Sequence, residues 1–227
     1  MILQIETATT SCSVALVHNG RVLALRERDE RNIHAEVITL FIESVFTEAG
    51  KTYNELDAIA VSSGPGSYTG LRIGVSTAKG LCFGLGKPLI AVPTLKAMAD
   101  GITERLKNEL TAHTLLCPMI DARRMEVFTA VFNASGQQVR PTEAVIVGGH
   151  SFAELLDSHK VIFFGDGAGK CRETITHPNA VFIDDFINSA AYLTPEATAK
   201  FGNAGFEDVA YFEPYYLKDF IAGKKKV

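Results

Sequence analysis

Residues 63–86 read SGPGSYTGLRIGVSTAKGLCFGLG and follow DAIAVSS (57–63), a short apolar run that predicts a buried strand. The glycines at 64, 66 and 70 predict an elbow that turns this strand into a helix. Glycine lets main chain bend sharply and approach other groups closely. We therefore expect the elbow to point backbone N–H groups outward, an arrangement that could cradle a phosphate at the N-terminus of the helix.

Two familiar phosphate motifs are excluded by the residues present. A P-loop ends in Gly-Lys-Ser/Thr, whereas Leu71 and Arg72 follow Gly70. A dinucleotide fingerprint needs a third glycine where this chain has Thr69, and an acid roughly 20 residues further on. No Asp or Glu occurs between residues 71 and 99. The sequence therefore contains neither a P-loop nor a dinucleotide fingerprint at the elbow.

The predicted helix at 70–86 is apolar or small on two sides. One stripe comprises Leu71, Val75, Ala78, Cys82 and Leu85, and a second comprises Ile73, Gly74, Leu81 and Gly84. Such a helix needs cover on more than one side. Either it is buried within its own domain, or one side docks a second protein.

Composition indicates an ordinary soluble globular protein, with 227 residues, 47% hydrophobic and 21% charged. The net charge of −4 argues against a protein that grips nucleic acid by itself. The one basic cluster, Lys224 to Lys226, is interpreted as a solvated tail. Four widely spaced cysteines, with no predicted signal peptide or membrane span, predict a reduced, cytoplasmic chain that binds no membrane.

The first half follows the order βββαβαβα. Strands are predicted at 2–6, 12–18, 21–27, 57–63 and 88–92, and helices at 34–49, at 70–86 and after Thr94. Asn19-Gly20 is a strong hairpin signal. Apolar residues at i, i+4 and i+8 support the helix at 34–49, which Gly50 closes.

An internal repeat predicts the architecture. The order strand, acid, turn, strand, glycine turn occurs first around Glu6 and again around Asp121, where EVFTAVF (126–132) is the second strand. We therefore predict an α/β protein with a duplicated ribonuclease-H-like fold, as in actin-like and Hsp70-like ATPases. The N-terminal lobe is placed at 1–107 and a smaller, reduced C-terminal lobe at 108–227.

The second half is shorter and looser than the first. A helix is predicted at 151–158 and a strand at 160–164, followed by a glycine run at 165–169. Helices are predicted on either side of an extended stretch at 181–183. The order of these predicted helices and strands repeats that of the first half in reduced form.

The run SGPGSYTGLRIG followed by AKGL resembles the signature of the TsaB (YeaZ) family, which is related to the TsaD, or glycoprotease-like, family. ETATTSCSVAL, the HAE segment, PMIDARRMEVF, GDGAG and PYYL fall where that family places them. The resemblance covers nearly the whole chain.

The resemblance implies a role in tRNA processing, as a non-catalytic subunit of the complex that makes N6-threonylcarbamoyladenosine at position 37 of tRNAs reading ANN codons. Its partners would be TsaD and the ATPase TsaE, with tRNA met only through the complex and a homodimer in isolation. The alternative is an independent enzyme, either an ATP-dependent small-molecule kinase or a glycoprotease-like peptidase.

Helices 34–49 and 70–86 are predicted to form the contact with TsaD, as in a four-helix interface. The predicted contact residues are Val37, Phe41, Val45, Phe46, Leu71, Val75, Ala78 and Lys79. On this interpretation, Val45→Arg or Val75→Arg abolishes binding and leaves the fold largely intact.

A weak nucleotide site is predicted between the lobes. In actin-like ATPases, acids at the positions of Glu6 and Asp121 hold hydrated Mg²⁺. The predicted site residues are Glu6, Thr7, Thr9, Thr10, Asp121, Gly165 and Gly167, with Ser11 as a further hydroxyl. The alternative interpretation is that the hydroxyls form hydrogen bonds within a tight turn and that the two acids lie in a solvated groove without a ligand. Because the family usually has Asp where this chain has Glu6, we expect no tightly bound cofactor, and ATP or ADP with Mg²⁺ only at the subunit interface of the complex.

No metal site is predicted. Enzymes that resemble TsaD carry two histidines four residues apart, and the matching positions here are Thr94 and Met98. His34 and the other histidines are interpreted as structural or surface residues. No G-x-S-x-G elbow is present, so no catalytic residue is assigned. Arg123 and Arg124 either bind an anion in the cleft or form a salt bridge with Asp121.

Overall fold

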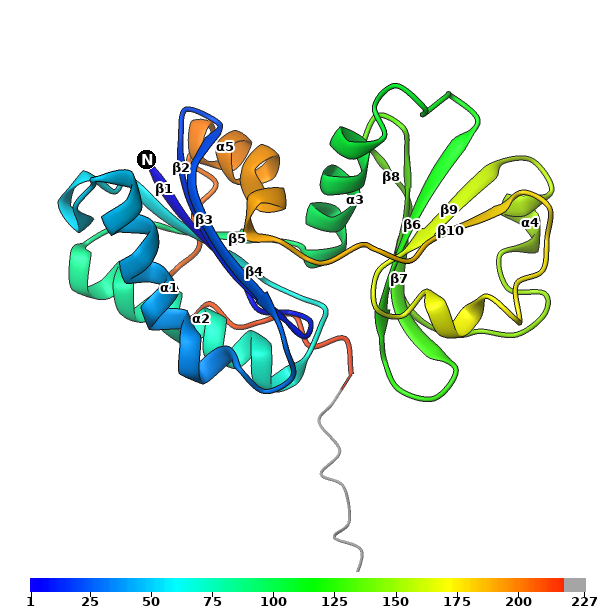
Figure 1. Ribbon diagram of the computed structural model, residues 1–227, viewed down its shortest axis with the longest axis horizontal. Coiled ribbons are helices and arrows are strands. Elements are labelled where there is room, and N and C mark those ends of the chain that lie inside the picture. Colours follow the sequence, from blue (N-terminus) through cyan, green and yellow to red (C-terminus); the bar gives the residue numbers. More distant parts are fainter. Residues whose placement is uncertain (219–227) are drawn as a thin grey trace, which may run out of the picture.

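The computed structural model describes residues 1–218 and has two lobes, each built on a five-stranded sheet (Figure 1). The first lobe comprises β1 (Ile2–Glu6), β2 (Ser11–His18), β3 (Arg21–Asp29), α1 (His34–Ala49), β4 (Ala58–Ser62), α2 (Tyr68–Leu85) and β5 (Leu89–Val92). These bounds confirm the helix predicted at 34–49. Each strand predicted in this half begins and ends within two residues of its predicted bounds.

The first sheet has the strand order β3-β2-β1-β4-β5. β1 to β3 form an antiparallel meander, whereas β4 and β5 run parallel to β1. Asn19 and Gly20 both have positive φ, of 49° and 73°, as the two-residue turn between β2 and β3 requires. The hairpin prediction is therefore confirmed.

Helices α1 and α2 cover one face of the first sheet (Figure 1). Their apolar stripes pack against the strands in one buried cluster that includes Leu3, Val14, Ile42, Val45 and Val75. Both helices end at a left-handed glycine, Gly50 or Gly86, whose N–H caps the last turn.

The second lobe repeats the first. It comprises β6 (Thr114–Asp121), β7 (Glu126–Asn133), β8 (Gln138–Ile146), α4 (Ala153–Leu156), β9 (Lys160–Phe164) and β10 (Ala180–Ile183). The strand order β8-β7-β6-β9-β10 corresponds strand for strand to that of the first sheet, because β6 to β8 form a meander and β9 and β10 run parallel to β6. The duplicated ribonuclease-H-like fold is confirmed.

The second lobe is reduced in its helices. The helix predicted at 151–158 spans only four residues, and the one predicted after the glycine run is a single 3₁₀ turn at Gly169–Cys171. Short loops and turns therefore take the place of the two long helices of the first lobe.

The chain crosses between the lobes twice. Helix α3 (Thr94–Arg105) leaves the first sheet and packs on the second, where Leu95, Met98 and Ile102 join the buried cluster of β6, β7 and β9. A 3₁₀ turn at Ala190–Leu193 and α5 (Thr194–Gly202) return to the first sheet. The predicted boundary between residues 107 and 108 stays a prediction.

All four cysteines are buried free thiols. Within residues 1–218 no helix is both long and apolar enough to cross a membrane. The predicted solvated tail, Lys224 to Lys226, lies outside the described residues.

Candidate functional site

The glycine-rich elbow lies against the turn that follows β1, with no space between them. A Cβ on Gly66 would lie 2.4 Å from the backbone oxygen of Ala8, and one on Gly70 would lie 2.1 Å from that of Thr7. The N–H of Ser67 donates to the Ala8 oxygen at 2.7 Å. These glycines therefore allow two segments of the same chain to touch.

The backbone N–H groups of the elbow are used within the chain. Ser63 N donates to the Val92 oxygen at 2.8 Å, and Gly64 N donates to Thr94 Oγ1 at 3.1 Å. Gly70 N donates to the Oγ of Ser67, which caps α2. For these three groups the prediction that the N–H points outward to cradle a phosphate is wrong, because the neighbouring strand, helix and cap accept their hydrogen bonds.

The C-terminal segment 203–218 covers the elbow from the other side. Tyr215 N donates to the Ser63 oxygen at 2.7 Å, and the Tyr216 ring lies 4.9 Å from that of Tyr68. Lys79 holds the same segment, because its Nζ donates to two of the segment's backbone oxygens at 2.9 and 3.2 Å. The start of the elbow, at Ser63 and Gly64, is thus covered by its own chain, whereas Ser67 and Thr69 stay exposed.

Glu6, at the end of β1, is 1% exposed. Its Oε1 accepts hydrogen bonds from Ala8 N at 2.6 Å and Ser62 Oγ at 3.0 Å. Burial raises the pKa of the Glu6 carboxyl to about 7, against the hydrogen bonds that lower it. A buried carboxyl that is bound in this way does not fit hydrated Mg²⁺, which needs an accessible, charged oxygen. Because Glu6 is buried, the alternative that it lies in a solvated groove is wrong as well.

The hydroxyls after Glu6 mostly serve the turn. Thr9 Oγ1 accepts from Ser11 N, and Ser11 Oγ donates to the Asn188 oxygen at 2.7 Å. Thr10 Oγ1 donates to Asp29 Oδ1 at 2.5 Å. Thr7 Oγ1 is buried without a partner and faces Gly74, where an added Cβ would lie 2.2 Å away. These contacts favour the tight-turn interpretation.

The acid of the second lobe lies in a different environment. Asp121 is exposed and pairs with Lys170. Asp166 Oδ1 accepts from Asp121 N at 3.0 Å, and burial raises the pKa of Asp166 to about 6, with Asp121 and Asp29 adding repulsion. The predicted residues Gly165 and Gly167 follow β9 and pack on β6, where Cβ atoms would lie 2.4 Å from the Met119 oxygen and 2.8 Å from the Ile120 carbonyl carbon.

Thr94 and Met98 both have structural roles. Besides accepting from Gly64, Thr94 donates its own N–H to the Gly64 oxygen at 3.0 Å. Met98 is 1% exposed and its Cε lies 2.6 Å from the Cβ position of Gly165. His34 is buried and contacts the Ser11 oxygen at 3.3 Å. Among residues 1–218, no three His, Cys, Asp or Glu side chains are placed to hold a metal ion.

The structure corrects the position of most predicted contact residues. Val37, Val45, Phe46, Leu71, Val75 and Ala78 are all buried inside the first lobe. Only Phe41 and Lys79 are partly exposed. The expectation that Val45→Arg or Val75→Arg spares the fold is wrong, because each side chain is at most 4% exposed in the core.

The surface of the two helices is formed by other apolar residues. Leu40 is 59% exposed and Phe83 is 87% exposed, while Phe41, Ile73 and Leu81 are partly exposed beside the core. We call Leu40, Phe41, Ile73 and Leu81 the helix-pair face. Sequence periodicity included Phe41, Ile73 and Leu81 among the apolar positions and missed Leu40, and it did not distinguish the buried side of each helix from the exposed one.

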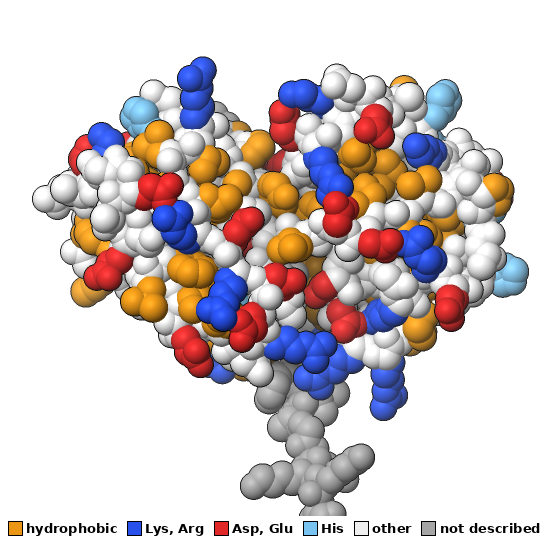
Figure 2. Space-filling model, in the orientation of Figure 1, with side chains coloured by type: hydrophobic (Ala, Val, Ile, Leu, Met, Phe, Trp, Pro, Cys, Tyr) orange, Lys and Arg blue, Asp and Glu red, His pale blue; other side chains and the backbone are white. Residues whose placement is uncertain are grey.

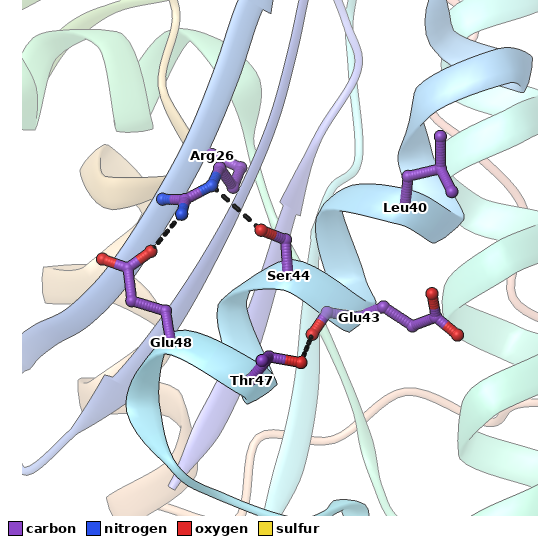
Figure 3. Close-up of a pocket in the computed structure, with 6 residues that line it drawn as sticks. All are labelled: Arg26, Leu40, Glu43, Ser44, Thr47 and Glu48. Atoms are coloured by element: carbon purple, nitrogen blue, oxygen red, sulfur yellow. Dashed lines mark hydrogen bonds and ion pairs between the residues drawn. The ribbon is translucent and has the colours of Figure 1, made fainter.

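A hollow of about 410 Å³ lies on α1 and β3 (Figure 3). Arg26 crosses it to pair with Glu48 and to donate to Ser44 Oγ at 3.0 Å, whereas Leu40 takes no part in these bonds (Figure 3). Arg26 and Glu48 neutralise each other, and the residues that line this hollow are far in sequence from the elbow. A second hollow, of about 270 Å³, lies between α2 and the segment 203–218.

Comparison with known proteins places these features in a family. A family model described as TsaD, tRNA N6-adenosine threonylcarbamoyltransferase, matches residues 28–219. The tRNA threonylcarbamoyladenosine biosynthesis protein TsaB of Escherichia coli is 32% identical over 99% of this chain and 97% of its own length, and that of Haemophilus influenzae is 36% identical over 99% and 96%. The solved structure of YeaZ from Pseudomonas aeruginosa matches with a TM-score of 0.80 and 26% identity, covering 95% of this chain and 99% of that one.

Proposed function

Because this chain belongs to the TsaB family of tRNA threonylcarbamoyladenosine biosynthesis proteins, we propose that it serves that pathway as a subunit without catalytic chemistry of its own. Its partner is a TsaD-type tRNA N6-adenosine threonylcarbamoyltransferase, with TsaE as a third member. The modified base is adenosine 37 of tRNAs reading ANN codons.

One observation carries the non-catalytic part of this proposal. Thr94 and Glu6 lie at positions where related enzymes carry a metal-binding side chain, and here both side chains are hydrogen-bonded within the fold. Thr94 Oγ1 accepts from the elbow, and Glu6 accepts from Ala8 N and Ser62 Oγ. A catalytic acid or metal ligand must reach the substrate, whereas these side chains are at most 1% exposed.

The helix-pair face is the surface proposed for the partner. Leu40 and Phe41 on α1 and Ile73 and Leu81 on α2 expose apolar atoms on two helices in contact with each other, which suits packing against a second helix pair at roughly 20°. The related transferase has a similar fold over most of this chain, as the match to residues 28–219 indicates. Without the transferase, the same face pairs two copies of this chain as a two-fold dimer.

Nucleotide binding belongs to the complex in this proposal. Since the elbow and Glu6 are occupied by the chain itself, ATP or ADP with Mg²⁺ binds at the interface between subunits and not to the isolated chain. Titration of the isolated chain with ATP and Mg²⁺ should therefore give no affinity in the micromolar range, and the assembled complex should bind. Micromolar affinity of the isolated chain would contradict this part.

Reconstitution tests the proposal as a whole. Purified tRNA, ATP, threonine, bicarbonate, the enzyme that forms the adenylate, TsaD and TsaE are combined with and without this chain. We expect modified tRNA to accumulate much faster with the chain, and the chain alone to modify no tRNA, hydrolyse no peptide and phosphorylate no small molecule. A transferase that works equally well without the chain, or turnover by the chain alone, would refute the assignment.

A further inference from the structure

The hairpin tip between β6 and β7 holds two consecutive arginines in an unusual backbone conformation. Arg123 has φ of 69° and Arg124 has φ of 46°. Residues other than glycine rarely adopt this left-handed region, which costs roughly 1 to 2 kcal/mol per residue. Strain of this kind collects where ligands bind.

The surrounding chain holds the tip in place. Asp121 Oδ1 accepts from Arg123 N at 3.0 Å, while Asp166 accepts from Asp121 N at the same distance. A hydrogen bond from Glu126 N to the Arg123 oxygen, 3.1 Å, closes the turn. The two arginines are therefore presented on a fixed support.

The charges around the tip leave both arginines unneutralised. Asp121 pairs with Lys170, and Glu126 pairs with Lys218. Asp166, the third acid near the tip, accepts from the backbone N–H of Asp121 and pairs with neither arginine within residues 1–218. Both arginine side chains are exposed, and no ion pair or hydrogen bond of either is found within residues 1–218. The sequence suggested a salt bridge between these arginines and Asp121, but in the structure Asp121 pairs with Lys170.

Basic side chains gather near this part of the molecule. Figure 2 shows Lys and Arg side chains, with Asp and Glu beside them, at the lower middle of the surface. Near the tip, Lys218 Nζ donates to Glu126 Oε1 at 2.6 Å. Within residues 1–218 the tip therefore presents two exposed cations that form no ion pair, on a chain whose net charge is −4.

We propose that Arg123 and Arg124 bind phosphates of the tRNA backbone, so that this chain contacts the RNA directly while it is part of the complex. The inference rests on the proposed function, because tRNA is the polyanion that the complex handles. Guanidinium groups bind phosphate oxygens with two parallel hydrogen bonds, and the fixed turn means that the backbone carrying them needs no further ordering.

The test replaces both residues in the assembled complex, as Arg123→Gly/Arg124→Gly. Glycine adopts the left-handed region without strain, so the chain should be at least as stable as the wild type. The complex should bind tRNA about tenfold more weakly at physiological salt, and the slope of log affinity against log salt should fall by between about 1 and 2.

The matched control is Arg21→Gln/Lys160→Gln. It also removes two exposed cations that have no ion pair within residues 1–218, and both lie at the opposite ends of their sheets from the turns after β1 and β6. This control should keep the wild-type affinity and salt slope. Arg123→Lys/Arg124→Lys keeps the charges and should keep most of the slope.

The outcomes separate this inference from the proposed function. Equal tRNA affinity and salt slope for the glycine variant and the control would overturn the RNA contact, as would loss of TsaD co-purification in the glycine variant, which would assign the tip to a protein partner. If the wild-type chain itself fails to bind TsaD, the proposed function fails, and the same variants are compared for tRNA binding by the chain alone. Equal binding there would overturn the inference as well.

Discussion

The contact between the elbow and the β1 turn predicts that one substitution has opposite effects at two places on α2. Gly70→Ala sets a methyl group 2.1 Å from the backbone oxygen of Thr7, which cannot rotate away. Gly80→Ala sets the same group in open space, with nothing within 4 Å. The added methyl group meets the backbone of the β1 turn in one variant and no neighbouring atom in the other.

The expected magnitudes follow from this difference. Alanine in place of glycine inside a helix gains roughly 0.5 to 1 kcal/mol, and Gly80→Ala should be stabilised by that amount. Overpacking costs typically 1 to 3 kcal/mol, and Gly70 lies in the first turn, where little helix propensity is gained. We therefore expect Gly70→Ala to lose about 1 to 3 kcal/mol.

Urea unfolding followed by circular dichroism measures both variants against the wild type. The midpoint should rise for Gly80→Ala and fall for Gly70→Ala, with unchanged slopes. If Gly70→Ala unfolds at the wild-type midpoint, there is room between the elbow and the turn. The view that the chain itself fills the phosphate cradle would then be wrong.

Three further predictions concern the core, the buried acid and the C-terminal segment. Val45→Arg should fail to fold, because it buries a charge at a position with 0% exposure. Leu40→Arg should fold and lose binding to TsaD in a pull-down. A folded Val45→Arg variant, or a Leu40→Arg variant that still binds TsaD, would contradict this prediction. The Glu6 pKa is raised from 4.5 to about 7, so its contribution to stability is full below about pH 4.5 and is lost as the pH rises through about 7. Glu6→Gln keeps an acceptor at Oε1 and should remove about 3 kcal/mol of pH dependence, seen in urea midpoints from pH 4.5 to 8. Lys79→Met should speed proteolysis within 203–218, because two hydrogen bonds to the segment are lost, and an unchanged cleavage rate would argue against that anchoring role.

Local pattern was sufficient for most of the architecture. Asn19-Gly20 specified a hairpin because both residues tolerate positive φ, and the spacing of apolar residues specified α1 to its last residue. The repeat around Glu6 and Asp121 predicted two sheets of the same strand order, as found. These features depend on neighbours in sequence, which is why sequence alone carries them.

The candidate site depended on contacts that sequence does not show. The acceptors for the elbow N–H groups come from Ala8, Val92 and Thr94, which lie far from it along the chain. Helix α2 is apolar on two sides, so periodicity did not indicate which side faces the sheet. The predicted contact residues were consequently taken from the core side, while Leu40 on α1 was missed.

The two crossings of the chain have a consequence for how the protein can be divided. Helix α3 is encoded before the second sheet yet shields it, and α5 is encoded after the second sheet yet shields the first. A fragment that ends at the midpoint of the chain would expose Leu95, Met98 and Ile102 to solvent. The same fragment would lack α5, which covers one face of the first sheet. Shortened genes are therefore expected to give aggregates in place of working halves, and the two lobes can be gained or lost only together.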